Sequence, residues 1–218
     1  MVKRIQYKTK QKWLLARKGK IGGSDAAAVL GLNPYKTNQE LYEEMTGLRA
    51  PLDRSDKSYV IYGTKAEEHI RALFALDHPE YQVDYYGDNM LINDKYPFAH
   101  ASLDGELIEL DTGRKGIFEC KTTELFSSMS KEKWNGDNIP DNYYIQVLHY
   151  LMVTEYEFVE LRAQIKSQWN GQIRLATKDY HIERQEVIQD IEILLEAERK
   201  FINQVNSRVT PALILPNI

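Results

Sequence analysis

Between residues 81 and 121 the chain carries a series of short β-prone runs, and this series limits the fold more than any other feature of the sequence. The runs cover residues 82–86, 90–92, 99–104, 106–110 and 116–121. Turn-forming stretches separate them, among them Asp-Lys-Tyr-Pro at 94–97 and Asp-Thr-Gly-Arg-Lys-Gly at 111–116. Strands joined by such short turns pair in opposite directions, so we predict an antiparallel meander.

Helical patterns lie on both sides of this block. Ser24 is the expected N-cap of a short Ala-rich helix that ends at Gly31, and a second helix is predicted at 38–45, ended by Gly47. A polar loop at 50–58 precedes a helix at 64–76, and the rest of the chain predicts helices at 142–154 and 184–206, strands at 158–165 and 172–182, and a polar turn at 166–171. This order predicts an α/β fold with a central mixed sheet flanked by helices.

Length and composition set further bounds. A chain of 218 residues, 43% of them hydrophobic and without a long linker, is expected to form one domain over residues 1–218. No apolar run approaches the ~18 to 20 residues of a membrane span, and the start is basic where a signal peptide is apolar, so we expect a cytoplasmic protein without a membrane segment. Cys120 is the single cysteine, so any bound metal must be held by oxygen ligands.

The charge is unevenly distributed. The net charge of −4 argues mildly against a nucleic-acid partner, but the first 20 residues carry eight Lys or Arg and no Asp or Glu. Such a segment is either an exposed basic tail or a surface that attracts DNA, and charge alone leaves both interpretations open. No Gly-x-x-x-x-Gly-Lys-Ser/Thr loop is present, so ATP is not expected as a ligand.

Two carboxylates and a lysine form the main chemical signal. Asp104 precedes Gly105 at the expected end of one strand, and Glu119 and Lys121 lie two residues apart on another. Side chains of a strand alternate between its faces, so Glu119 and Lys121 point to one side and Cys120 to the other. Mg²⁺ prefers carboxylate oxygens and keeps several waters, so this set can serve a magnesium-dependent hydrolase. The alternative is an ordinary salt bridge within a strand.

Five ordered blocks of sequence make the case more specific. The chain resembles the PD-(D/E)xK nuclease superfamily, and within it the YqaJ-like viral recombinases and the lambda-exonuclease-type phage nucleases. The resemblance covers roughly residues 13–155 and rests on residues 17–26 (RKGKIGGSDA), 62–68 (YGTKAEE), 102–105 (SLDG), 118–123 (FECKTT) and 143–150 (YYIQVLHY). Leu103 stands where the superfamily nominally has proline, a position that holds no ligand. The resemblance implies a restriction-endonuclease-like core.

The same resemblance implies the roles of the central residues. Asp104 and Glu119 would hold the metal, Mg²⁺ with Mn²⁺ as a substitute, together with the main-chain carbonyl of Cys120. Lys121 would assist the attacking water.

Two helices and an early loop would complete the site. Glu67 matches a helix glutamate near a second metal, whereas its neighbour Glu68 lies about 100° round the helix. Gln146 matches the glutamine of the late helix. Arg17 and Ser24 resemble the pair that holds a terminal 5′-phosphate.

The function that follows is an expectation from the resemblance. It is a metal-dependent exonuclease on double-stranded DNA, 5′ to 3′, which leaves 3′ single-stranded tails for phage-type recombination. A single-strand annealing protein would be a partner, and a homo-oligomer, a trimer in the family, would be the assembly. Two alternatives stay open: a site- or structure-specific endonuclease on the same core, and a non-catalytic DNA-binding subunit. A single cysteine excludes the iron–sulfur nucleases that share this core.

Overall fold

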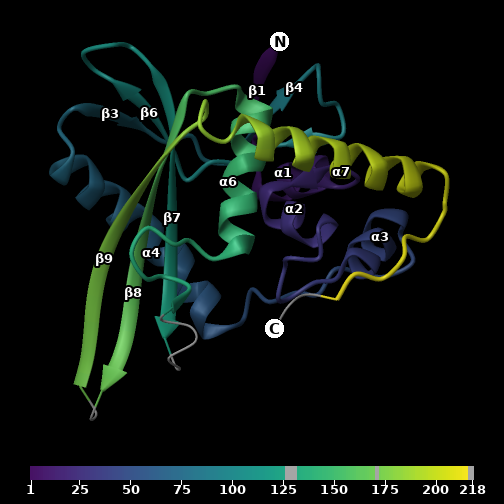
Figure 1. Cartoon of the computed structure of the whole chain (residues 1–218), viewed down its shortest axis with the longest axis horizontal. Helices are drawn as coiled ribbons and strands as arrows, with labels where there is room; N and C mark the ends of the chain where they lie inside the picture. The colour runs from purple at the N-terminus through teal and green to yellow at the C-terminus, as the bar shows by residue number, and fades with distance from the viewer. Residues whose placement is uncertain (126–131, 170–171, 216–218) are drawn as a thin grey trace.

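A computed structural model of the chain describes residues 1–125, 132–169 and 172–215 (Figure 1). Its helices are α1 (Lys10–Arg17), α2 (Gly23–Val29), α3 (Asn38–Thr46), α4 (Ser58–Asp77), α6 (Asp141–Thr154) and α7 (Ile188–Asn206). Its strands are β1 (Val2–Gln6), β2 (Ile21–Gly22), β3 (Tyr81–Asp84), β4 (Asn89–Asn93), β5 (Ala99–His100), β6 (Gly105–Glu109), β7 (Lys115–Leu125), β8 (Phe158–Trp169) and β9 (Gln172–Glu183). Among these residues, no helix combines the length and the apolar character that a membrane crossing requires.

A five-stranded sheet in the order β3-β6-β7-β8-β9 forms the centre of the molecule. β7 and β8 run parallel, joined by α6, whereas the other neighbouring pairs are antiparallel. The sheet is therefore mixed, and α4 and α6 lie on its two sides (Figure 1). The α/β class with a mixed sheet flanked by helices is confirmed.

The two sides of β7 pack against different helices. Phe118 and Cys120 pack in a cluster with α4, whereas Ile117 belongs to the main core beneath α6 and α7. This alternation follows from the two-residue period of a strand. The alternation also determines which helix each side chain of the Glu-Cys-Lys segment at 119–121 lies against.

The predicted meander is only partly right. β3, β6 and β7 are consecutive antiparallel neighbours, but β4 pairs with β1 and the two-residue β5 pairs parallel with β2. The N-terminal segment supplies partners for these runs, so residues 1–20 are not a free tail: they contain a paired strand and a helix. The backbone groups of β4 and β5 hydrogen-bond to a segment remote in sequence, which local patterns do not encode.

Several predicted boundaries also need correction. The N-cap of α2 is Gly22, which has no side chain to cap the helix, and Ser24 is the second residue of the helix. α4 begins at Ser58, six residues before the predicted start, and α7 begins at Ile188 instead of residue 184. β8 extends to Trp169, so the strands enter the predicted turn at 166–171, of which residues 170–171 lie outside the described residues.

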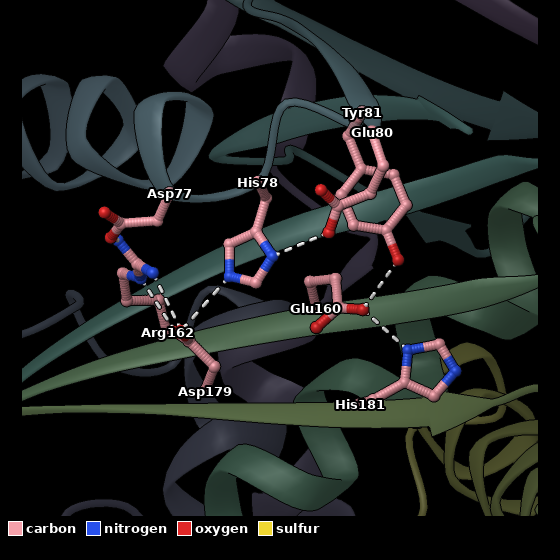
Figure 2. A network of polar contacts seen from close by, with 8 residues as sticks. All are labelled: Asp77, His78, Glu80, Tyr81, Glu160, Arg162, Asp179 and His181. Atoms are coloured by element: carbon pink, nitrogen blue, oxygen red, sulfur yellow. Dashed lines mark hydrogen bonds and ion pairs between the residues drawn. The ribbon is translucent and has the colours of Figure 1, made fainter. Parts of the chain in front are cut away.

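A polar network fixes the C-terminal end of α4 to β8 and β9 (Figure 2). Arg162 is buried and donates to Asp77 at 2.7 Å and, through two nitrogens, to both carboxylate oxygens of Asp179. His78, directly after α4, contacts Asp179 at 3.4 Å. A guanidinium removed from water needs such paired carboxylates, because a buried charge without a partner costs several kcal/mol. The network thus anchors the end of α4, the helix that carries Glu67.

Candidate active site

Asp104 lies in the bend before β6, not at the end of a strand as predicted. Its Oδ2 accepts the backbone N–H of Cys120 at 3.0 Å, and its carbonyl accepts a hydrogen bond from Arg71 of α4 at 2.7 Å. Gly105 follows with its Cα close to Phe118, where an added Cβ would come within 3.1 Å of that side chain. These contacts hold the Asp104 carboxylate against the middle of β7.

Glu119 and Lys121 point to the same side of β7, as the alternation predicts. The Lys121 Nζ donates to Glu119 Oε1 at 2.5 Å, and the side chains are 1% (Glu119) and 16% (Lys121) exposed. The Lys121 ammonium also lies 5.1 Å from the ring centre of Tyr143 on α6, a distance at which a cation is attracted to a ring. The pair is therefore enclosed between β7 and α6.

Gln146 and Tyr150 of α6 complete this buried group. Gln146 Nε2 donates to Glu119 Oε1 at 2.8 Å and to the Tyr150 hydroxyl at 2.9 Å. The ring of Tyr150 rests on Gly23, where any Cβ would come within 2.4 Å of the ring. Gly23, from the first sequence block, thus has a packing role, because only glycine leaves room for the tyrosine.

The electrostatics of the group are those of crowded carboxylates. Burial, followed by the charge of Asp104, raises the pKa of Glu119 to about 8, even though Lys121 acts in the opposite direction. Burial also opposes the charge of Lys121, but Glu119 and Asp104 outweigh it and raise the pKa of the ammonium above its ordinary value. Lys121 is therefore a fixed cation, and ionisation of Glu119 costs free energy that a further positive charge at the site would offset.

Glu67 approaches from α4. At Gly63, one turn earlier, α4 comes so close to β7 that an added Cβ would lie 3.2 Å from Thr122 Oγ1. Burial and the charge of Asp104 raise the pKa of Glu67 to about 7. Glu68 is exposed, so the helix presents Glu67 and not its neighbour to the site, in line with the face predicted from the sequence.

A cleft of about 330 Å³ opens beside these carboxylates. Asp104, Glu67 and Arg17 of α1 are among the residues that line it. Ser24 is exposed and is not among the residues that line the cleft. The structure therefore brings Arg17, but not Ser24, into one cavity with the carboxylates.

The donor set fits a hard cation. Glu119 Oε1 is occupied by Lys121 and Gln146, whereas Oε2 is buried and finds no hydrogen-bond partner among the described residues. A buried carboxylate oxygen without a partner is costly, and a cation would satisfy it. Among the residues that the structure describes, no group of three His, Cys, Asp or Glu side chains is arranged to bind a metal by itself. A metal here would rely on Asp104, Glu119, a main-chain carbonyl such as that of Cys120, and water.

The sequence did not reveal a second buried pair next to this site. His149 of α6 and Glu198 of α7 are both 0% exposed and lie 2.7 Å apart (Nδ1 to Oε1). The other ring nitrogen of His149 donates to the carbonyl of His100, which lines the cleft, at 3.0 Å. The sequence signal that points to this pair is Glu198, a charged residue at a core-facing position of the last helix. The pair ties α7 to the cleft wall, so His149 has a structural partner here.

Comparison with known proteins identifies the family. Residues 12–157, about two thirds of the chain, match the model of the YqaJ-like viral recombinase domain. The chain belongs to this family. All five sequence blocks fall inside the matched residues. The chain is also 32% identical over 163 residues to the uncharacterized protein YqaJ of Bacillus subtilis (strain 168), covering 69% of this chain and 44% of that relative, so it spans less than half of the relative's length.

Solved structures share the fold of this YqaJ-like domain. An alkaline exonuclease from Laribacter hongkongensis superposes with a TM-score of 0.63 at 17% identity, covering 92% of this chain and 94% of that one. A phage related exonuclease from Haemophilus somnus 129PT gives a TM-score of 0.54 at 15% identity, with 87% and 96% covered. These likenesses show that the chain has the fold of these two exonucleases.

Proposed function

We propose that the chain is a metal-dependent nuclease that hydrolyses DNA from its ends. The observation that carries the proposal is the arrangement of Asp104, Glu119 and Lys121 around one strand. A buried oxygen of Glu119 has no hydrogen-bond partner among the described residues, and Asp104 lines the cleft. Buried like charges destabilise a fold, and such clusters gather at functional sites. Membership of the YqaJ-like family supports the assignment.

The proposed cofactor is Mg²⁺, with Mn²⁺ as a substitute, held by Asp104, Glu119 and the carbonyl of Cys120, with Glu67 near a second ion. When bound, the metal supplies charge neutralisation at the phosphate and a more acidic water. Lys121, a fixed cation, orients the attacking water and offsets charge that develops on the phosphate.

Gln146 has a supporting role in this proposal. Its amide donates to the Glu119 oxygen that also receives Lys121, so it fixes the rotamer of the carboxylate and leaves the other oxygen toward the cation. A ligand held in this way loses little entropy on binding. Gln146 therefore acts through Glu119, and its removal should reduce the rate without abolishing it.

The finer part of the proposal concerns the substrate. We infer a double-strand exonuclease that degrades one strand from 5′ to 3′ and leaves 3′ tails for phage-type recombination. Arg17 in the cleft supports an end-binding role, since a guanidinium grips a phosphate with two parallel hydrogen bonds. The two structural neighbours above are named exonucleases, which agrees with this substrate class. A single-strand annealing protein as partner and a homotrimer as assembly belong to the same proposal.

The test is product analysis on matched substrates. Linear duplex with 5′-phosphate ends, the same duplex with 5′-hydroxyl ends and a covalently closed circle are incubated with protein in Mg²⁺ or EDTA. We expect mononucleotides from the linear substrates, faster from the 5′-phosphate form, and no cleavage of the circle. Discrete fragments or a cleaved circle would indicate the endonuclease alternative. Binding without cleavage in Mg²⁺ and Mn²⁺ would indicate a non-catalytic subunit.

A further inference from the structure

The short helix α1 presents one polar stripe to the cleft. Lys10, Trp13 and Arg17 follow at intervals of three and four residues, which puts them on one side of a helix, and all three line the cleft. No residue of α1 is buried. The helix is held instead by Trp13, whose indole N–H donates to the carbonyl of Asn89 on β4 at 2.8 Å.

Trp13 also positions Arg17. The guanidinium carbon of Arg17 lies 4.5 Å from the ring centre of Trp13, within the range of a cation–π contact. A side chain packed on a ring loses less freedom when it binds a ligand than one that extends into water. The tryptophan therefore links α1, and with it Arg17, to β4.

The stripe carries the cationic side chains of the cleft. Among the described residues that line it, Lys10 and Arg17 are the cationic side chains, and Asp88, Glu67 and Asp104 are the acidic ones. Arg17 lies beside His100, because a Cβ added at Gly22 would come within 3.0 Å of the His100 ring and 3.7 Å of Arg17 Nη2. Lys10, at the other end of the stripe, lines the same cleft as Glu67 and Asp104. Seven residues of helix separate the Cα atoms of Lys10 and Arg17 by roughly 10 Å.

We propose that Lys10 is a second phosphate-binding residue, which holds a phosphodiester of the same strand whose end is held by Arg17. This inference rests on the proposed function and extends it to Lys10, which lies outside the five sequence blocks. A phosphate that approaches Glu67 and Asp104 meets two carboxylates, and Lys10 is placed to offset them. With both phosphates fixed by one helix, α1 sets how far the strand end extends past the carboxylates.

Binding measurements test this role independently of cleavage. Affinity for a 5′-phosphorylated duplex is measured in Ca²⁺, with the DNA checked to be intact, at a series of salt concentrations. The affinity K falls as salt rises, so the slope of log K against log salt is negative, and each lost phosphate contact makes it less steep by about 0.9. We expect this loss and a several-fold weaker affinity for Lys10→Ala, with the slope restored in Lys10→Arg. Lys12→Ala, two residues away and outside the cleft lining, is the matched control with an unchanged slope.

Neutral methylphosphonate links locate the contact. One link at a time is placed at the first, second or third phosphodiester from the 5′ end. We expect one position at which the neutral link weakens wild-type binding but has no further effect on Lys10→Ala. If wild type binds and Lys10→Ala keeps the wild-type slope, or if all positions behave alike, Lys10 only balances the carboxylates and the inference is overturned. If wild type does not bind duplex ends, the proposed function fails, and this inference with it.

Discussion

Glu119→Gln should make the metal-free protein less sensitive to pH while it removes activity. The Glu119 side chain is 1% exposed, and its pKa is raised from 4.5 to about 8, chiefly by burial and then by Asp104. The folded state therefore binds this proton more tightly than the unfolded state does. The contribution of Glu119 to stability is therefore greatest at low pH and is lost as pH rises from about 4.5 to about 8. At 1.36 kcal/mol per pH unit the loss has a ceiling of about 5 kcal/mol.

The glutamine amide keeps the shape of the side chain but cannot ionise, so this pH-dependent loss should shrink by a few kcal/mol. The assay is urea unfolding in EDTA at intervals between pH 5 and pH 9, for wild type and Glu119→Gln side by side. Mg²⁺ should reduce the loss in wild type and have little effect on the variant. Equal pH profiles for the two proteins in EDTA would contradict this expectation, because the buried carboxyl of Glu119 would then not be the group that titrates.

Three further predictions concern neighbouring groups. Glu67→Gln should slow cleavage by an order of magnitude or more, whereas cleavage by Glu68→Gln, at an exposed position, should stay near the wild-type rate. The reverse result in initial rates would mean that Glu68, and not Glu67, acts in the site. Arg17→Ala should reduce the preference for 5′-phosphate over 5′-hydroxyl ends by about 1.5 to 3 kcal/mol in initial rates; an unchanged preference means the phosphate is bound elsewhere. Burial opposes the charged form of His78, but its bonds to Glu80 and Asp179 outweigh this and raise its pKa. His78→Gln should therefore lose a stabilisation that is present below about pH 6.5 and fades at higher pH, and unfolding curves with no such pH dependence would contradict this.

The chemistry of the site was predictable where it depends on local periodicity. The two-residue period of a strand puts Glu119 and Lys121 together, and helical spacing separates Glu67 from Glu68. Gln146 was placed near the metal residues by resemblance, and the structure shows it in contact with Glu119. The class of fold followed from the order of helical and β-prone patterns.

The remaining features depend on contacts between distant segments. β1 pairs with β4 across more than 80 residues of sequence, and Trp13 of the next helix hydrogen-bonds to Asn89 of β4, so contacts remote in sequence hold the basic N-terminal segment in the cleft wall. Ser24 satisfied the pattern of a helix cap, but the helix begins earlier because the glycines before it pack under Tyr150 and beside His100. The contact of His149 with Glu198 joins two helices 49 residues apart in sequence. No local pattern specifies such partners.

The most direct test of the account is a rate measurement on four proteins. Wild type, Asp104→Asn, Glu119→Gln and Lys121→Ala are compared on linear 5′-phosphorylated duplex over a Mg²⁺ titration, with circular dichroism to verify that each is folded. We expect wild type to release mononucleotides only when the metal is present, and none of the three folded variants to release a measurable amount. Wild-type turnover by any one of them, or wild-type turnover in EDTA, would contradict the assignment of these residues as a metal-dependent nuclease centre.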